Sequence, residues 1–261
     1  MEFDNILLVH NGKPTDLHNQ VLSNVERLLE SSAIKYNVVR DFDLQKSVFN
    51  DKDLIITVGG DGTFIRASHF IHDAFIIGIN SEPETSEGAW TSLNGEEIEK
   101  IEKILTGNFK TRKVNRINVL RNNVLLDSHA LNEVYVGSAN QFHTSRYDLI
   151  HKGKREYQKS SGVLISTNFG SNSWFMSAGG KPFQTEEELR FIVREPFLGK
   201  VFQPEIIEGS LSKDESLILE SKRKDGGVIA LDSTLIYEFN NSDKVEISLS
   251  ENELNILEPS L

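Results

Sequence analysis

A short apolar run that ends in glycines is the feature that most constrains this fold. Residues 54 to 58 read Leu-Ile-Ile-Thr-Val, and Gly59-Gly60-Asp61-Gly62-Thr63 and a helical pattern to His72 follow at once. A run that is apolar on both faces predicts a strand buried in a parallel sheet. Glycines after such a strand let main-chain N–H groups approach a phosphate, and the next helix directs the positive end of its dipole to the same point. We therefore expect an anion site here.

Asp61, in the middle of this loop, indicates the chemistry. A carboxylate beside a phosphate is unfavourable unless a divalent metal bridges the two or the carboxylate takes a proton from an attacking hydroxyl, and both indicate phosphoryl transfer. An ordinary tight turn is the alternative, because Gly and Asp are common turn formers. The chain contains no G-x-x-x-x-G-K-[ST], and the loop lacks the third glycine of G-x-G-x-x-G.

The order of β-rich and helical patterns predicts two domains. Short β-rich runs alternate with helical patterns up to about residue 110, and from residue 111 short strands follow one another through turn-like stretches. This order predicts an α/β N-terminal domain with a Rossmann-like parallel sheet and a mainly antiparallel β C-terminal domain. We expect the first domain to span residues 1–110, joined by the tail 245–261, and the second to span residues 111–244. The stretch from Glu251 to Leu257 is expected to be a short helix.

Composition limits the partners. The formal net charge of −11 argues against nucleic acid and anionic membranes, so an anionic substrate needs a local cationic patch. The densest cationic run is His151-Lys152-Gly153-Lys154-Arg155 with Lys159. It is the natural partner for nucleotide phosphates, although lysines on a hairpin are usually only solvated. We favour contact for Lys159.

Cysteine and histidine usage bears on the compartment and on metals. There is no cysteine, which excludes disulfides and thiol chemistry, and no segment approaches the length of a membrane span. The first residues have no leader pattern, so we expect a cytoplasmic protein. The seven histidines show no H-x-x-x-H spacing, so no protein-held metal is expected and a divalent metal should arrive with the nucleotide.

Three motifs in the right order and spacing make the chain resemble the NAD kinase family, and the mitochondrial-type branch best. They are Gly-Gly-Asp-Gly-Thr at 59–63, Asn132-Glu133, and the stretch from Ser161-Gly162 through Ser171-Asn172-Ser173-Trp174. The resemblance runs from about residue 50 to 255. Supporting stretches are Gly78-Ile79-Asn80-Ser81-Glu82-Pro83, Ser86-Glu87-Gly88, Lys159-Ser160-Ser161-Gly162, Arg194-Glu195-Pro196-Phe197 and Asp232.

The resemblance implies a reaction and its partners. Such kinases move the γ-phosphoryl group of ATP to the 2′-hydroxyl of the adenosine ribose of NAD, with Mg²⁺ or another divalent metal, and give NADP. Asp61 matches the aspartate that positions and deprotonates this hydroxyl. The resemblance also implies a homo-oligomer, with a dimer favoured.

Site residues follow from the same motifs. Some of these positions have a second interpretation: Arg66 as a solvated side chain, Trp90 as a core residue, Asp232 as a turn former, and Asn132-Glu133 as a polar pair that closes a strand. The residues expected to bind phosphate or nucleotide are Gly59, Gly60, Gly62, Thr63, Arg66 and Lys159, and those expected to bind NAD are Asn80, Trp90, Asn132, Glu133, Ser161, Asn172, Trp174 and Asp232.

Departures from the pattern leave alternatives open. Ser161 stands where the commoner bacterial branch has an aspartate, and the mitochondrial-type branch shares the Ser-Gly pair. Diacylglycerol and sphingosine kinases and phosphofructokinase-type sugar kinases share the glycine loop, but their later motifs are absent. A non-catalytic module that binds NAD(P) is a further alternative, because the third motif is altered. The choices of NAD or NADH, and of ATP or polyphosphate, stay open.

Overall fold

The computed structural model describes residues 3–12, 15–140 and 142–260. The chain divides into two compact units, Met1–Val114 with Glu253–Leu261, and Asn115–Asn252. Each unit has an apolar core of its own. The fold class expected from the sequence, α/β followed by antiparallel β, is confirmed.

The first unit is built on one sheet with the strand order β2-β1-β3-β4-β19-β6, and β5 pairs with β4. The strands from β2 to β19 pair in parallel, and β6 runs antiparallel to β19. The elements of this unit are β1 (Asn5–His10), α1 (Asp16–Ser31), β2 (Lys35–Arg40), the 3-10 turns η1 (Asp41–Asp43) and η2 (Lys46–Phe49), β3 (Leu54–Gly59), α2 (Asp61–Ser68), β4 (Phe75–Asn80), β5 (Leu93–Asn94), α3 (Glu99–Leu105), β6 (Phe109–Val114) and β19 (Leu254–Pro259).

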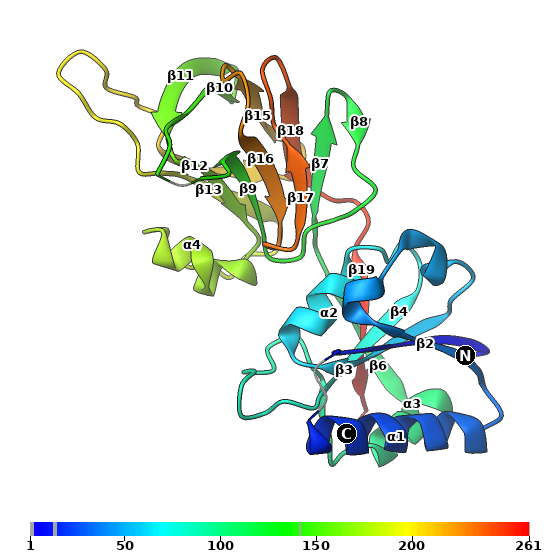
Figure 1. The fold of residues 1–261 in the computed structure, drawn as a ribbon. Coiled ribbons are helices and arrows are strands. Elements are labelled where there is room, and N and C mark those ends of the chain that lie inside the picture. Colours follow the sequence, from blue (N-terminus) through cyan, green and yellow to red (C-terminus); the bar gives the residue numbers. More distant parts are fainter. Residues whose placement is uncertain (1–2, 13–14, 141, 261) are drawn as a thin grey trace. The chain divides into compact units, whose positions relative to one another are not determined.

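Helices cover both faces of this sheet, with α1 and α3 on one face and α2 on the other (Figure 1). In strand β4, successive residues face opposite sides of the sheet, so the strand contacts helices on both faces. Ile77 and Ile79 are buried in the core shared with α1 and α3. Gly78 lies between them and points to the opposite face, where a Cβ would lie 3.0 Å from the Phe64 ring of α2. Strands buried on both faces explain the continuous apolar runs in the sequence.

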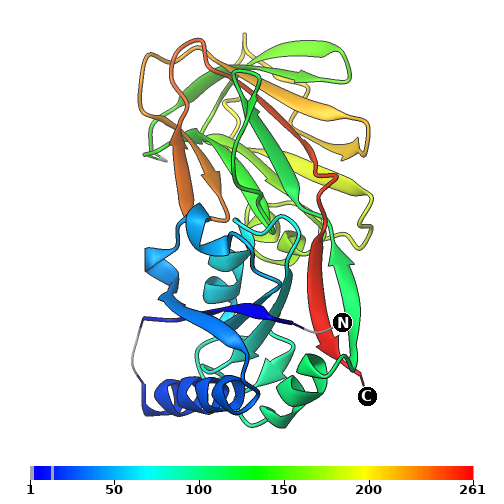
Figure 2. The same cartoon turned by 90° about the vertical axis from the view of Figure 1, so that its right-hand side faces the viewer.

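The C-terminal tail is a strand, and the predicted short helix from Glu251 to Leu257 is wrong. Strand β19 pairs with β4 on one side and with β6 on the other, as Figure 2 shows for the red and green strands. Leu254 and Ile256 are fully buried. The tail also returns later than residue 245, because β18 (Lys244–Leu249) pairs with strands of the second unit. Pairing with distant strands, rather than local pattern, decides that the tail is a strand and where it rejoins the first unit.

The second unit consists of two antiparallel sheets whose side chains share one core. Their strand orders are β11-β10-β15-β18-β7-β8 and β14-β13-β12-β9-β16-β17. The remaining elements are β7 (Ile117–Arg121), β8 (Val124–Leu125), β9 (Glu133–Ser138), β10 (Ser145–His151), β11 (Lys154–Ser160), β12 (Gly162–Ser166), the 3-10 turn η3 (Gly170–Asn172), α4 (Trp174–Ser177), β13 (Glu188–Arg194), β14 (Glu208–Ser212), β15 (Ser216–Ser221), β16 (Gly227–Leu231) and β17 (Leu235–Glu238).

The short helix α4 covers the outer face of the second of these sheets. Phe175 of α4 is buried against Tyr135 of β9 and Leu164 of β12. Among the helices in the described ranges, none combines the length and apolarity that a membrane crossing would require.

Candidate active site

The glycine loop lies at the carboxyl end of the central strand of the first unit. Gly59 is the last residue of β3 and pairs with Asn80 at the end of β4. Gly60 caps α2, and Asp61 is the first residue of that helix. A Cβ on Gly59 would lie 2.5 Å from the Thr63 hydroxyl oxygen, and one on Gly60 would lie 2.7 Å from Oγ of Ser86. Close approach therefore requires glycine at both positions.

The carboxylate of Asp61 is bound by the segment that follows β4. Oδ1 accepts the main-chain N–H of Trp90 at 2.7 Å, and Oδ2 accepts those of Gly88 and Ala89 at 3.1 Å each. The hydroxyl of Ser86 donates to Oδ2 at 3.4 Å and accepts the N–H of Asp61 at 3.1 Å. Asp61 is therefore fixed in orientation, and the sequence predicted none of these partners.

Thr63 and Arg66 turn toward a buried carboxylate. The Thr63 side chain donates to Oδ2 of Asp41 at 3.0 Å, and Arg66 donates to the same oxygen through Nε at 3.1 Å and through Nη2. The Asp41 side chain is fully buried, so its charge needs such partners. Both side chains are bound to Asp41 here, and their expected contacts with phosphate stay predictions. Sequence reasoning missed Asp41 because nothing marks it locally.

Trp90 is a core residue in this structure. It is 5% exposed and stacks on Phe64 at a centroid distance of 5.8 Å and an interplanar angle of 10°. Phe64 covers one face of this ring, and the expected contact with adenine stays a prediction. Asn80 supports the loop instead: its Oδ1 accepts the N–H of Glu82 at 2.9 Å, and its Nδ2 donates to the carbonyl of Ser86 at 3.2 Å.

In the second unit, Asp232 joins the residues of the second motif. Oδ1 accepts the N–H groups of Asn132 at 2.7 Å and Glu133 at 3.0 Å, and Oδ2 accepts that of Leu131 at 2.7 Å. Asp232 itself follows β16 and has a φ of 47°. This is a turn residue, as one interpretation predicted, and it also positions the start of β9.

Glu133 is a buried carboxyl with an unusual environment. It is 7% exposed, and no partner within the described residues reaches its Oε2. Burial, and secondarily the charge of Asp232, raises the pKa of Glu133 to about 8. At neutral pH the side chain is therefore mostly protonated and carries a hydrogen-bond donor.

Residues of the third motif meet around Tyr135. The Tyr135 hydroxyl donates to the carbonyl of Ser161 at 2.7 Å, and the Trp174 ring lies 5.4 Å from the Tyr135 ring. The guanidinium of Arg194 lies over the Trp174 ring, 5.2 Å from its centroid. Asn172 is exposed at the end of η3. Ser161 and Trp174 are thus brought together through a tyrosine that the sequence did not single out.

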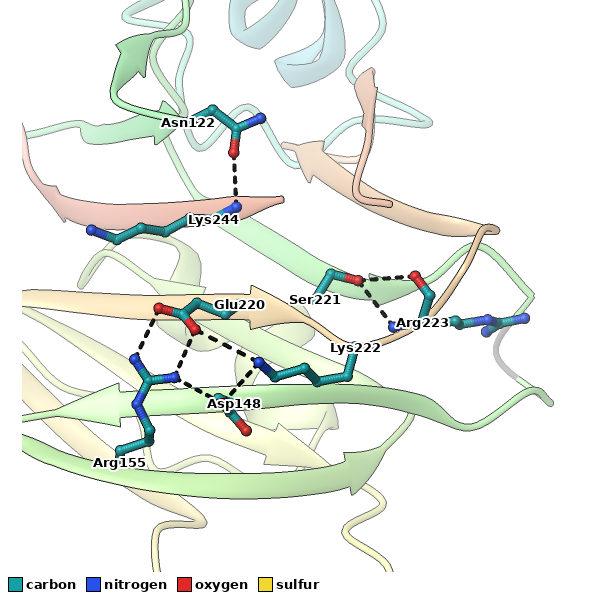
Figure 3. Close-up of polar contacts among 8 residues, drawn as sticks. All are labelled: Asn122, Asp148, Arg155, Glu220, Ser221, Lys222, Arg223 and Lys244. Atoms are coloured by element: carbon teal, nitrogen blue, oxygen red, sulfur yellow. Dashed lines mark hydrogen bonds and ion pairs between the residues drawn. The ribbon is translucent and has the colours of Figure 1, made fainter. Parts of the chain in front are cut away.

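The cationic run lies on the β10–β11 hairpin and is largely neutralised by carboxylates. Figure 3 shows Arg155 between Glu220, at 2.6 Å, and Asp148, at 2.8 Å. Lys222 reaches the same Asp148 at 3.1 Å. Lys152 and Lys154 pair with Glu215 and Glu205, respectively. These charges form a paired outer face of the sheet, and phosphate contact by this run stays untested.

Lys159 has a different environment from the rest of the run. Its Nζ lies 5.3 Å from the ring centroid of Phe202 and 5.8 and 5.9 Å from those of Tyr157 and Phe197. Cation–π attraction to these rings competes with any phosphate for the amine. In the described parts of the chain, no group of three or more His, Asp or Glu side chains could hold a metal ion.

Known proteins similar to this chain are NAD and NADH kinases. No family model matches the chain. A probable NADH kinase from Oryza sativa subsp. japonica is 26% identical over 269 residues, covering 93% of this chain and 82% of the relative. The mitochondrial NAD kinase 2 of Homo sapiens is 26% identical over 251 residues, covering 77% of this chain and 57% of the relative. The resemblance to NAD kinases, the mitochondrial type included, is confirmed.

Solved structures show the same fold. Yeast NADH kinase complexed with NADH matches with a TM-score of 0.81 and 14% identity, over 100% of this chain and 84% of that chain. An NAD kinase from Archaeoglobus fulgidus in complex with ATP matches with a TM-score of 0.74 and 21% identity, over 98% of this chain and 94% of that chain.

Proposed function

We propose that this protein is an NAD kinase, which transfers the γ-phosphoryl group of ATP to the adenosine ribose 2′-hydroxyl of NAD and so gives NADP. The observation that carries the proposal is the place of Asp61, at the first residue of α2 and directly after the glycines that end β3. The names of the relatives support the same reaction over lipid or sugar phosphorylation. The match to a kinase solved with ATP supports ATP as the donor.

Asp61 acts as the base in this proposal. A ribose hydroxyl is a weak nucleophile at neutral pH, and a carboxylate within hydrogen-bond reach that takes its proton contributes roughly 10²- to 10⁴-fold in rate. The glycines allow the main chain to approach the transferred group, and the amino end of α2 favours its negative charge. The three N–H groups and the hydroxyl that Asp61 accepts hold its carboxylate in place beside the glycines.

A divalent metal would be held mainly by the nucleotide. Asp61 is surrounded by hydrogen-bond donors, which is unlike the open carboxylate cluster that Mg²⁺ prefers. The triphosphate of ATP supplies oxygen ligands, and the metal would neutralise charge on the transferred group. The residues of this chain are assigned no direct metal contact.

The second unit supplies residues for the dinucleotide in this proposal. Asn132 and Glu133 carry hydrogen-bonding side chains at the start of β9, where Asp232 fixes the main chain. The protonated carboxyl of Glu133 offers a donor to a ribose or base acceptor. Ser161, Asn172 and Trp174 remain proposed contacts, and so does Lys159 for phosphate.

NADH is the second candidate substrate, because two of the similar proteins are named NADH kinases. The test is an assay of the purified chain with ATP and Mg²⁺ and either NAD or NADH. Formation of NADP or NADPH, with the phosphate on the 2′-oxygen by nuclear magnetic resonance, supports the proposal. Binding of NAD by calorimetry without any product would support the non-catalytic module instead. Polyphosphate in place of ATP tests the donor.

The compartment and the assembly are also proposals. A cytoplasmic location rests on the sequence, in which there is no cysteine. A homodimer rests on the resemblance alone. Light scattering of the purified chain measures the oligomeric state. Microscopy of a tagged chain in its own cell measures the location.

A further inference from the structure

The hydroxyl of Ser86 lies beside Asp61, the residue that acts as the base in the proposed function. It donates to Oδ2 of Asp61 at 3.4 Å and accepts the first N–H of α2, that of Asp61, at 3.1 Å. The close approach to Gly60 fixes it there, since a Cβ at residue 60 would lie 2.7 Å from both Cβ and Oγ of Ser86. A hydroxyl beside a carboxylate base is the arrangement that activates a nucleophile, and such contacts are often longer before a substrate binds.

The geometry points to Ser86 as an internal phosphoryl acceptor, which the protein phosphorylates on itself when ATP is bound and NAD is absent. This inference rests on the proposed function, because it needs the γ-phosphoryl group of ATP at the glycine loop. It adds an activity and a modification site to that function.

The step balances without any further reagent. Asp61 takes the proton of the Ser86 hydroxyl, the serine oxygen forms a bond to the γ-phosphorus, and the bond from that phosphorus to the bridging oxygen of ADP breaks. The products are phosphoserine, ADP and a proton that Asp61 releases to water. The same base and the same phosphate position serve the reaction with NAD, so the two acceptors compete.

Other hydroxyls near the loop lack this arrangement. Thr63 is 2% exposed, and its hydroxyl donates to Asp41. Ser68 is fully buried, and its hydroxyl donates to the carbonyl of Ile65 at 2.8 Å. Thr85 precedes Ser86 and is exposed, and within the described residues no hydrogen bond joins it to Asp61. Ser86, in contrast, is partly exposed.

The test is incubation of the purified chain with ATP and Mg²⁺ but without NAD, followed by mass spectrometry of its peptides. We expect one phosphate on Ser86. Its first-order rate constant should not depend on protein concentration, because the acceptor and the base lie in one chain. Ser86→Ala should abolish it, and Asp61→Asn should slow it by about 10²- to 10⁴-fold. Thr85→Ala, one residue away, should retain it. Saturating NAD should slow it.

Each outcome decides the inference. No phosphate on Ser86 in a preparation that makes NADP from NAD overturns this inference and leaves the proposed function intact. No phosphate and no NADP overturn both. Phosphate on Ser86 that Asp61→Asn does not slow, or that forms faster at higher protein concentration, contradicts the role of Asp61 and overturns the inference.

Discussion

Oδ1 of Asp232 accepts the main-chain N–H of Asn132 at 2.7 Å, although 100 positions separate the two residues. The same carboxylate also accepts the N–H groups of Leu131 and Glu133. A single side chain therefore satisfies three donors at the start of β9 and fixes the direction in which the Asn132 and Glu133 side chains leave the main chain. This explains a role for Asp232 that does not require contact with a substrate.

Replacement of Asp232 should cost stability. Asp232→Asn puts an NH₂ group against at least one main-chain N–H and leaves that buried donor unpaired, so we expect the free energy of unfolding to fall by about 2 to 4 kcal/mol. Urea denaturation measures it. The control is Asp225→Asn in the exposed turn before β16, which should change it by less than about 0.5 kcal/mol. Equal effects of the two variants would contradict the role of Asp232.

Asp41 should contribute more to stability than its place in a short turn indicates. Asp41→Ala leaves the Arg66 guanidinium, 25% exposed, and the Thr63 hydroxyl without their acceptor, and we expect a loss of about 3 to 5 kcal/mol in unfolding free energy. Asp43→Ala is the matched control, because Asp43 is exposed and pairs with Arg40 on the surface. It should cost no more than about 1 kcal/mol. A thermal or urea titration that ranks Asp43→Ala as the more harmful change would contradict this account.

Glu133 should make stability depend on pH. Burial raises its pKa to about 8 in the folded chain, whereas an unfolded glutamate titrates near about 4.3. Between these values the folded chain binds more protons than the unfolded chain, so stability conferred at low pH is lost as the pH rises. Relative to Glu133→Gln, which does not titrate, the wild-type free energy of unfolding should fall by about 2 to 4 kcal/mol from pH 5 to pH 8.5. A difference that stays constant with pH would show that Glu133 titrates normally.

Local pattern made the first unit predictable. The apolar run before Gly59, the glycines and the helical pattern after Thr63 are adjacent in the sequence, and strand, loop and helix all occur there. The alternation of elements was likewise sufficient for the fold class. The tail was not predictable in the same way, because β19 becomes a strand only through pairing with β4 and β6.

Side-chain partners were the part that the sequence could not provide. Thr63 and Arg66 lie in the first turns of α2, as expected, but their side chains turn to Asp41, which lies 22 and 25 residues earlier. Trp90 was expected either to bind NAD or to lie in the core, and it is buried against Phe64. Motif spacing fixes where the main chain goes, whereas the direction of a side chain depends on buried charges and aromatic packing that no local pattern records.

The most direct test of the central claim is the rate of NADP formation by Asp61→Asn under saturating ATP, Mg²⁺ and NAD. Asparagine keeps the size of the side chain but cannot take the proton, so we expect kcat to fall by about 10²- to 10⁴-fold while the fold, followed by circular dichroism, is retained. A folded Asp61→Asn protein that forms NADP at the wild-type rate would contradict the assignment of Asp61 as the base.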